Sequence, residues 1–183
     1  MINFHCAFTG HRPQKFPWRY DETAPDCMKL KLVLSKQVEV LAAAGVTEFL
    51  SGMAEGTDTW GAQAVLTLRE KNPALKLHCV LPCENQADKW TQAARECYFN
   101  ILAQADKTTY VSRKFTRDCM LERNRFLVDY ADILLAVYNG EWRGGTAATV
   151  RYAQKKDRVL IIIDPANFGV TCLTEEWAAR LNH

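Results

Sequence analysis

The sequence has little net charge. Of its 183 residues, 23 are Lys or Arg and 21 are Asp or Glu, which leaves a formal net charge of +2 at pH 7. Proteins that hold nucleic acids through the phosphate backbone usually carry a strong basic excess. The charge balance therefore argues against a nucleic acid as the partner of this protein.

Long hydrophobic runs are also absent. Apolar runs such as Ile133–Val137 and Val159–Ile163 contain only five residues each, whereas a membrane-spanning helix needs about 20. The N-terminus has no basic stretch and reaches the polar residues 9–12 before a signal-peptide core could form. We therefore expect a cytoplasmic protein with no membrane partner.

The cysteines do not form a metal-binding pattern. There are seven, an odd number, and they contain no C-x-x-C pair; only Cys79 and Cys83 lie close together. No second pair of ligands at zinc spacing accompanies them. We expect reduced thiols and no bound metal.

Two common phosphate-binding fingerprints are missing as well. Neither G-x-G-x-x-G nor G-x-x-x-x-G-K-[ST] occurs in the sequence. This absence excludes an ordinary dinucleotide-dependent dehydrogenase and a P-loop ATPase. We expect no required cofactor, although a nucleotide-type ligand remains compatible with the sequence.

The pattern that is present is an alternation of short apolar runs with longer segments of helical period. It is typical of a parallel sheet with crossover helices, so we predict an α/β fold and one domain over residues 1–183. The expected strands are 2–8, 46–50, 77–81, 108–112, 133–138 and 159–163, and the expected helices lie near 26–44, 57–71, 87–104, 116–130, 145–156 and 174–181. The nearly continuous hydrophobicity of the strands suits burial on both faces.

Three segments that follow expected strands are rich in glycine, threonine and charge: residues 9–13, 51–58 and 139–146. In open α/β sheets, ligands bind beyond the carboxyl ends of the strands. Gly52 and Gly56 before one helix, and Gly144 and Gly145 before another, would let backbone N–H groups converge on a phosphate. The same pattern also serves plain helix capping and turns.

The helix expected at 116–130 carries two polar residues of interest. A helical projection places Asn124 at the centre of the apolar stripe and Arg123 at its border; the stripe comprises Met120, Leu121, Leu127, Val128 and Ala131. Arg123 either clamps a phosphate or ribose group or pairs with an acid, and Asn124 either serves the site or ties down a loop.

Three further residues near these loops have a functional and a structural interpretation. Asp58 either accepts ribose hydroxyls or complements a helix dipole. Glu55 is either a general acid/base or a solvated loop charge, and His11 is either a proton carrier or a polar loop residue.

The aromatic residues divide in the same way. Trp60, Trp90 and Trp177 fall in helices with apolar neighbours, so we expect them in the core, whereas Trp18 and Trp142 fall in loops where they could stack on a base. The irregular segment 14–25 carries Phe16, Trp18 and Tyr20, and it would cover a ligand or make a contact with another chain.

Taken together, the motifs resemble the YpsA-like branch of the SLOG superfamily over roughly residues 2–165. The motifs are Thr9-Gly10-His11-Arg12-Pro13, Ser51-Gly52-x-x-x-Gly56-x-Asp58-x-Trp60, Arg123-Asn124-x-x-x-Val128-Asp129-x-x-Asp132 and Gly144-Gly145-Thr146-x-x-Thr149-Val150-Arg151-Tyr152-Ala153. The superfamily also contains the DNA-processing protein DprA and the LOG phosphoribohydrolases. The resemblance implies a Rossmann-like three-layer sandwich, with a mainly parallel sheet of about six strands and a nucleotide pocket. The residues expected to bind the ligand are Thr9, Gly10, Arg12, Ser51, Gly52, Gly56, Thr57, Asp58, Arg123, Asn124, Gly144, Gly145 and Thr146.

The resemblance to the LOG enzymes is incomplete. Their Met-x-x-Arg motif is similar to Met120-Leu121-Glu122-Arg123, but Arg151 stands where their Gly-Gly-x-Gly-Thr-x-x-Glu motif places its glutamate. Cleavage of an N-glycosidic bond passes through an oxocarbenium-like transition state that a carboxylate stabilises. The missing carboxylate argues against that activity.

The main hypothesis is therefore a protein that binds a nucleotide or a nucleotide-derived molecule, such as a nucleoside monophosphate, ADP-ribose or an NAD fragment, as a sensor. The alternatives are a nucleotide N-glycosidase, with Arg123, Glu55 and Asp58 as the catalytic candidates, and an interaction module that uses the aromatic segment. A homo-oligomer is compatible with all three.

Overall fold

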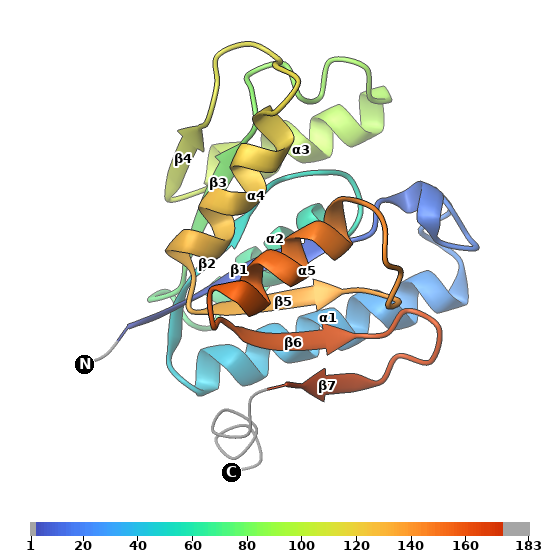
Figure 1. The fold of residues 1–183 in the computed structure, drawn as a ribbon, viewed down its shortest axis with the longest axis vertical. Helices are drawn as coiled ribbons and strands as arrows, with labels where there is room; N and C mark the ends of the chain where they lie inside the picture. Colours follow the sequence, from blue (N-terminus) through green and yellow to red (C-terminus); the bar gives the residue numbers. More distant parts are fainter. Residues whose placement is uncertain (1–2, 174–183) are drawn as a thin grey trace.

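The computed structural model describes residues 3–173, and these form a seven-stranded sheet covered by helices (Figure 1). The strands are β1 (Phe4–Gly10), β2 (Val46–Ser51), β3 (Lys76–Leu81), β4 (Lys107–Tyr110), β5 (Ile133–Val137), β6 (Val159–Ile163) and β7 (Val170–Cys172). Their order is β4-β3-β2-β1-β5-β6-β7, and all neighbours are parallel except the β6–β7 pair. The predicted α/β class and mainly parallel sheet are confirmed, and β7 is an addition.

Five α-helices and a 3-10 turn connect the strands within the described range: η1 (Pro13–Lys15), α1 (Pro25–Ala43), α2 (Thr57–Arg69), α3 (Gln92–Gln104), α4 (Cys119–Tyr130) and α5 (Gly145–Lys155). The helix predicted from residue 87 begins later, because the Thr91 side chain accepts a hydrogen bond from the Ala94 N–H at 3.3 Å and caps α3. The helix predicted near 174–181, and Trp177 with it, lies outside the described residues. None of the helices in residues 3–173 is long and apolar enough to cross a membrane.

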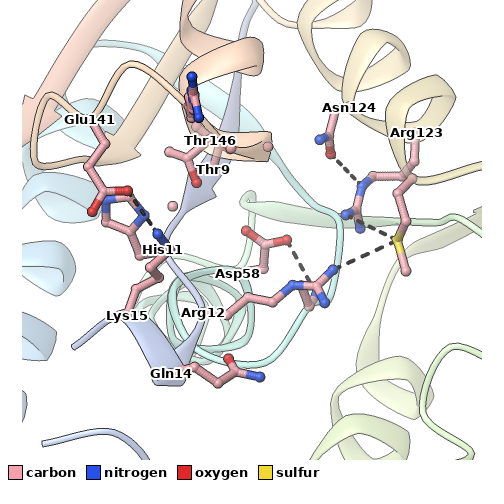
Figure 2. A pocket seen from close by; sticks show the side chains of 16 residues that line it. Thr9, His11, Arg12, Gln14, Lys15, Asp58, Arg123, Asn124, Glu141 and Thr146 are labelled. Atoms are coloured by element: carbon pink, nitrogen blue, oxygen red, sulfur yellow. Dashed lines mark hydrogen bonds and ion pairs between the residues drawn. The ribbon is translucent and has the colours of Figure 1, made fainter. Parts of the chain in front are cut away.

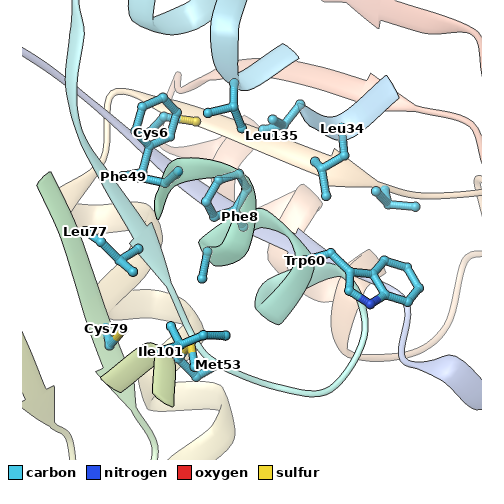
Figure 3. Close-up of a cluster of buried hydrophobic side chains, with 14 of the residues drawn as sticks. Cys6, Phe8, Leu34, Phe49, Met53, Trp60, Leu77, Cys79, Ile101 and Leu135 are labelled. Atoms are coloured by element: carbon cyan, nitrogen blue, oxygen red, sulfur yellow. The ribbon is translucent and has the colours of Figure 1, made fainter. Parts of the chain in front are cut away.

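The sheet separates two hydrophobic clusters. The larger one lies under α1, α2 and α3, where Phe8 and Phe49 stack with ring centroids 5.8 Å apart (Figure 3). The smaller one lies under α4 and α5 and contains Leu127 and Val150. Successive residues of a strand point to opposite faces, so β1 contributes Phe8 to the first cluster and Ala7 to the second. The result is the predicted three-layer sandwich.

The aromatic segment after η1 is anchored to the core. The rings of Phe16 and Trp18 stack at 4.8 Å, and Phe16 also stacks on the buried Trp60 at 5.7 Å. Of the three aromatic side chains in this segment, only Tyr20 is exposed, with 56% of its surface accessible to solvent. Trp18 is therefore a packing residue rather than a free stacking platform, and the aromatic surface expected of an interaction module is reduced to one side chain.

The strand order reverses at β1, which lies between β2 and β5. From β1 the chain proceeds outward through β2, β3 and β4, then returns through α4 to β5 on the other side. Loops that follow β1 and β5 therefore diverge and leave a crevice at the carboxyl edge, the usual ligand position in open α/β sheets. Because β1, β2 and β5 are parallel, the three glycine-containing loops lie on one edge, as predicted.

Candidate functional site

A cavity of about 610 Å³ lies at this reversal of strand order (Figure 2). Its volume falls within the range of roughly 300–1,000 Å³ that is usual for small-molecule sites. It is lined by Thr9, Gly10, His11, Arg12, Gln14, Lys15, Ala54, Asp58, Met120, Arg123, Asn124, Glu141, Arg143, Gly144, Gly145 and Thr146. The wall thus contains most of the residues predicted to bind the ligand, and the exceptions are Ser51, Gly52, Gly56 and Thr57.

The N-terminus of α5 forms an open wall of the cavity. Gly144 precedes the helix with a φ of 104°, a left-handed conformation that favours glycine. The Ala148 N–H makes the first turn's hydrogen bond to the Gly144 carbonyl at 3.0 Å, so the amides of residues 145–147 precede the intrahelical ladder. A Cβ added at Gly144 or Gly145 would meet no heavy atom within 4 Å. Backbone donors at the positive end of α5 therefore face open space, which suits an anion.

The hydroxyl of Thr149 is not a free donor on this wall, because its Oγ1 donates to the Gly145 carbonyl at 2.8 Å. Thr149 is buried, whereas Thr146 is half-buried and lines the cavity. Thr146 is therefore the threonine of α5 that is positioned to contact a ligand.

The N-terminus of α2 is closed, in contrast to that of α5. The Thr57 hydroxyl donates to the His11 carbonyl at 3.2 Å, and a Cβ added at Gly10 would lie 2.4 Å from Thr57 Oγ1. Gly56 has a φ of 91°, and a Cβ added there would lie 3.0 Å from the His11 carbonyl oxygen. Gly56 and Thr57 therefore hold the β1 loop against α2, and neither of them lines the main cavity, although both were predicted to bind the ligand.

Ser51 and Gly52 likewise serve the structure of the loop. Ser51 Oγ donates to the Asp58 carbonyl at 2.7 Å and accepts a hydrogen bond from the Met53 N–H at 3.1 Å. Gly52 leaves room for a side chain, since a Cβ there would lie 2.3 Å from Arg123 Nη1. Both residues were predicted to bind the ligand, and neither of them lines the cavity.

Arg123 is buried, with 4% of its surface exposed. Its Nη1 donates to the Gly52 carbonyl, its Nε donates to Asn124 Oδ1 at 2.8 Å, and its Nη2 lies 3.9 Å from Met120 Sδ. Burial lowers the pKa of Arg123, and the nearby carboxylate of Asp58 opposes that shift. Arg123 thus forms part of the wall while it ties α4 to the β2 loop.

The helical projection predicted that Asn124 is more deeply buried than Arg123, and the structure shows the reverse. Asn124 is only partly buried, and Leu121, assigned to the apolar stripe, is 42% exposed. The reason is that Met120 and Asn124 line the cavity at the start of α4, while Arg123 turns inward to the Gly52 carbonyl.

Asp58 is a buried carboxylate on the cavity wall, in the first turn of α2. Its Oδ2 accepts a hydrogen bond from the Ala54 N–H at 3.3 Å. Burial raises the pKa of Asp58, and the opposing effects come from Arg123, the Ala54 N–H and Arg12. Figure 2 shows Asp58 at the same end of the cavity as the two arginines. The carboxylate is therefore available to accept hydrogen bonds from a neutral donor such as a sugar hydroxyl.

Arg12 is the exposed arginine at that end of the cavity. Its Nη2 lies 3.9 Å from Met120 Sδ, a weak acceptor. Unlike Arg123, it makes no hydrogen bond to a backbone carbonyl or carboxylate within residues 3–173. The planar fork of donors of Arg12 is therefore free for an anionic group.

The other end of the cavity contains a polar network that joins the β1 and β5 loops. His11 Nε2 lies 3.0 Å from Asn139 Oδ1, Asn139 Nδ2 donates to Glu141 Oε1 at 3.0 Å, and Lys15 pairs with Glu141 Oε2 at 2.9 Å. Burial lowers the pKa of His11, which favours a neutral ring at pH 7. These contacts support the structural interpretation of His11.

Glu55, predicted as a catalytic candidate together with Asp58, does not line this cavity; its side chain lines two smaller neighbouring hollows. Trp142, predicted to stack on a base, is 78% exposed and lies beneath the Arg151 guanidinium at 4.9 Å. Arg151 also donates to the Trp142 carbonyl at 2.6 Å. The side chain at the position of the LOG glutamate is therefore held outside the cavity.

Gln14 and Lys15 are lining residues that the sequence did not single out. They belong to η1, which places them at the cavity mouth, and Pro13 at its first position is the one local signal of that turn. Within residues 3–173 no group of three or more His, Cys, Asp or Glu side chains is arranged to hold a metal ion.

Comparison with known proteins identifies relatives of this chain. A UPF0398 protein of Bacillus pumilus is 32% identical over 151 residues, which cover 81% of this chain and 80% of that protein. A UPF0398 protein of Bacillus velezensis is 27% identical over 153 residues, covering 82% and 83% of the two chains.

The structure is similar to the X-ray structure of DNA processing protein A (DprA) from Streptococcus pneumoniae, with a TM-score of 0.61 at 14% identity. The match covers 99% of this chain but 55% of the DprA chain, and it shows a shared Rossmann-type fold. The sequence model of the YspA SLOG family matches residues 6–167. This chain therefore belongs to the YspA SLOG family.

Proposed function

We propose that this protein binds a nucleotide or a nucleotide-derived small molecule in the cavity at the strand reversal, and that it acts as a sensor of that molecule. Candidates are a nucleoside monophosphate, ADP-ribose or an NAD fragment. The observation that carries the proposal is the open N-terminus of α5, whose unpaired backbone donors share one cavity with Arg12 and the buried Asp58. Membership of the SLOG family supports a nucleotide-related function in general terms.

The charges of the cavity favour an anionic ligand. Four cationic side chains and two carboxylates line it in the part of the chain that the structure describes. Lys15 and Glu141 neutralise each other at 2.9 Å, which leaves three arginines and one aspartate. In this arrangement the phosphate lies on the α5 amides, as anions do at helix N-termini.

The remaining polar groups suit a sugar. The buried Asp58 faces the cavity, and a carboxylate hydrogen-bonded to hydroxyl donors is stabilised in a site of low polarity. The free guanidinium of Arg12 adds a second contact for phosphate. Arg123 positions the wall through Gly52 and Asn124, so Arg12 takes the clamping role that the sequence suggested for Arg123.

Thermal unfolding with and without ligand tests the proposal. AMP, ADP-ribose and nicotinamide mononucleotide are compared with adenosine, which lacks the phosphate. At a free concentration of 100 times Kd, binding adds about 2.7 kcal/mol, or roughly 5–10 °C for a domain of this size. Mass spectrometry of small molecules released from the denatured protein supplies the ligand's identity. No shift with any nucleotide at millimolar concentration would refute the proposal.

A second candidate, a nucleotide N-glycosidase, is favoured by one observation. Burial raises the pKa of Asp58, which would help it to carry a proton to a leaving base. However, Arg151 occupies the position of the LOG glutamate, and its contacts with Trp142 hold it outside the cavity. We therefore expect no free base when nucleoside monophosphates are incubated with the protein and separated by chromatography. Steady release that Asp58→Asn abolishes would establish the enzyme instead.

A further inference from the structure

The cavity at the strand reversal continues into a second hollow. This hollow has a volume of about 230 Å³ and shares Arg12, Gln14 and Met120 with the main cavity. A third hollow, of about 450 Å³, shares Tyr20 and other residues with the second. A groove therefore runs from the N-terminus of α5 past Arg12 to a part of the surface that the proposed nucleotide site does not use.

The second hollow contains two aromatic side chains, Tyr20 and Trp90. Tyr20 is 56% exposed, and it follows directly on the segment that Phe16 and Trp18 anchor to the core. Trp90 is half-buried and packs edge to face against Tyr98 with ring centroids 5.2 Å apart. Aromatic side chains on a fixed backbone are the usual surface against which a planar heterocycle stacks.

Glu55 lies in the same hollow. It is half-buried, and its carboxylate has no hydrogen-bond or ion-pair partner within residues 3–173. Burial raises the pKa of Glu55, and Arg12 opposes that shift. A partly desolvated carboxylate without donors is stabilised when a ligand supplies N–H groups.

Arg12 stands where the two hollows meet. It lines both, it is exposed, and its contact with Met120 Sδ at 3.9 Å leaves its donors available. An arginine at this point matches the phosphates that join two nucleosides, because its fork can bind two oxygens at once. Lys89 adds a second cation to the wall of the smaller hollow.

We propose that the ligand is of dinucleotide type. One nucleoside occupies the main cavity, and the linking phosphates lie between the α5 amides and Arg12. The second ring stacks at Tyr20 and Trp90 and donates N–H hydrogen bonds to Glu55. This inference rests on the proposed nucleotide-binding function and adds the size of the ligand. It also assigns Tyr20 and Glu55 as residues that select a dinucleotide over a mononucleotide.

Isothermal titration calorimetry with AMP and with P1,P2-diadenosine diphosphate tests the assignment. We expect the dinucleotide to bind about 10- to 100-fold more tightly than AMP, the effect of one stacked base. Tyr20→Ala removes most of this advantage and leaves the affinity for AMP unchanged. Tyr110→Ala is the matched control, since Tyr110 is 47% exposed and lies on β4 away from the groove. It should change neither affinity.

Glu55→Gln tests the hydrogen bonds, because it keeps the shape and removes the charge. We expect about tenfold weaker binding of diadenosine diphosphate and no change for AMP, since charged acceptors form stronger hydrogen bonds than neutral ones. Equal affinities of the wild type for both ligands, or equal loss of both on Tyr20→Ala, would overturn the dinucleotide assignment and leave the proposed function standing. If neither ligand binds, the dinucleotide assignment is wrong, and thermal unfolding with ADP-ribose and nicotinamide mononucleotide decides whether the proposed function stands.

Discussion

An alanine at Gly145 should separate ligand binding from stability. Gly145 is the first residue of α5, its φ is not in the left-handed region, and an added Cβ meets no heavy atom within 4 Å. At such a position, replacing glycine by alanine stabilises a protein by about 0.4–1 kcal/mol, because the unfolded chain loses freedom. We therefore expect Gly145→Ala to raise the melting temperature of the free protein by about 1–4 °C.

The same methyl group stands on the cavity wall, beside the amides proposed to hold the phosphate. Glycine is needed where a ligand approaches the backbone closely. An extra methyl in a packed contact costs about 1–3 kcal/mol, which corresponds to a roughly 5- to 150-fold increase in Kd. Calorimetry with AMP measures the affinity, and thermal unfolding without ligand measures the stability.

Gly52→Ala is the contrasting variant. Its Cβ would lie 2.3 Å from Arg123 Nη1, so Arg123 or the β2 loop must move, and we expect a loss of about 1–3 kcal/mol of stability.

If Gly145→Ala binds AMP as tightly as the wild type, the phosphate does not contact the N-terminus of α5. That result would refute the placement of the ligand.

Three further variants test other parts of the site. Arg12→Ala should weaken AMP binding by about 1.5–3 kcal/mol in calorimetry and change stability by less than about 0.5 kcal/mol, because the side chain is exposed. Arg123→Ala should lower the free energy of unfolding by about 1–3 kcal/mol in urea, because the Gly52 carbonyl loses its donor; unchanged stability would contradict the positioning role. Burial raises the pKa of Asp58 above its ordinary value of 3.8. Between pH 3.8 and the raised pKa, the folded state therefore binds more protons than the unfolded state. The stability of the protein falls as the pH rises through this window. Asp58→Asn should therefore gain stability over the wild type at pH 7 and lose the gain near pH 4 in urea unfolding, and an equal difference at both pH values would exclude this linkage.

The strands could be predicted because their signal is local. The apolar runs of β5 and β6 are buried from both sides, so hydrophobicity alone marked Ile133–Val137 and Val159–Ile163. β7 was not predicted because it has only three residues, Val170–Cys172, and pairs antiparallel with β6 after the chain turns back. A run of that length has no measurable period.

The orientation of α4 could not be predicted because its partner is remote in the sequence. A helical projection assumes that the apolar stripe meets the sheet along the whole helix. The first turns of α4 instead line the cavity, and Arg123 reaches the Gly52 carbonyl, 71 residues earlier in the chain. That contact buries a charged residue and leaves Leu121 42% exposed, against the order of hydrophobicity.

The glycine loops show why the position of the site could be predicted while the roles of its residues could not. A glycine between a strand and the helix that follows it is needed both where a phosphate approaches the backbone and where another protein segment does. At Gly10 and Gly52 the space of the missing Cβ is taken by Thr57 and Arg123, whereas at Gly145 it is empty. The sequence pattern is the same in the two cases, because what fills the space comes from a distant part of the chain. The two glycines with occupied space support the cavity from within the protein, and the unoccupied one marks where a ligand can approach.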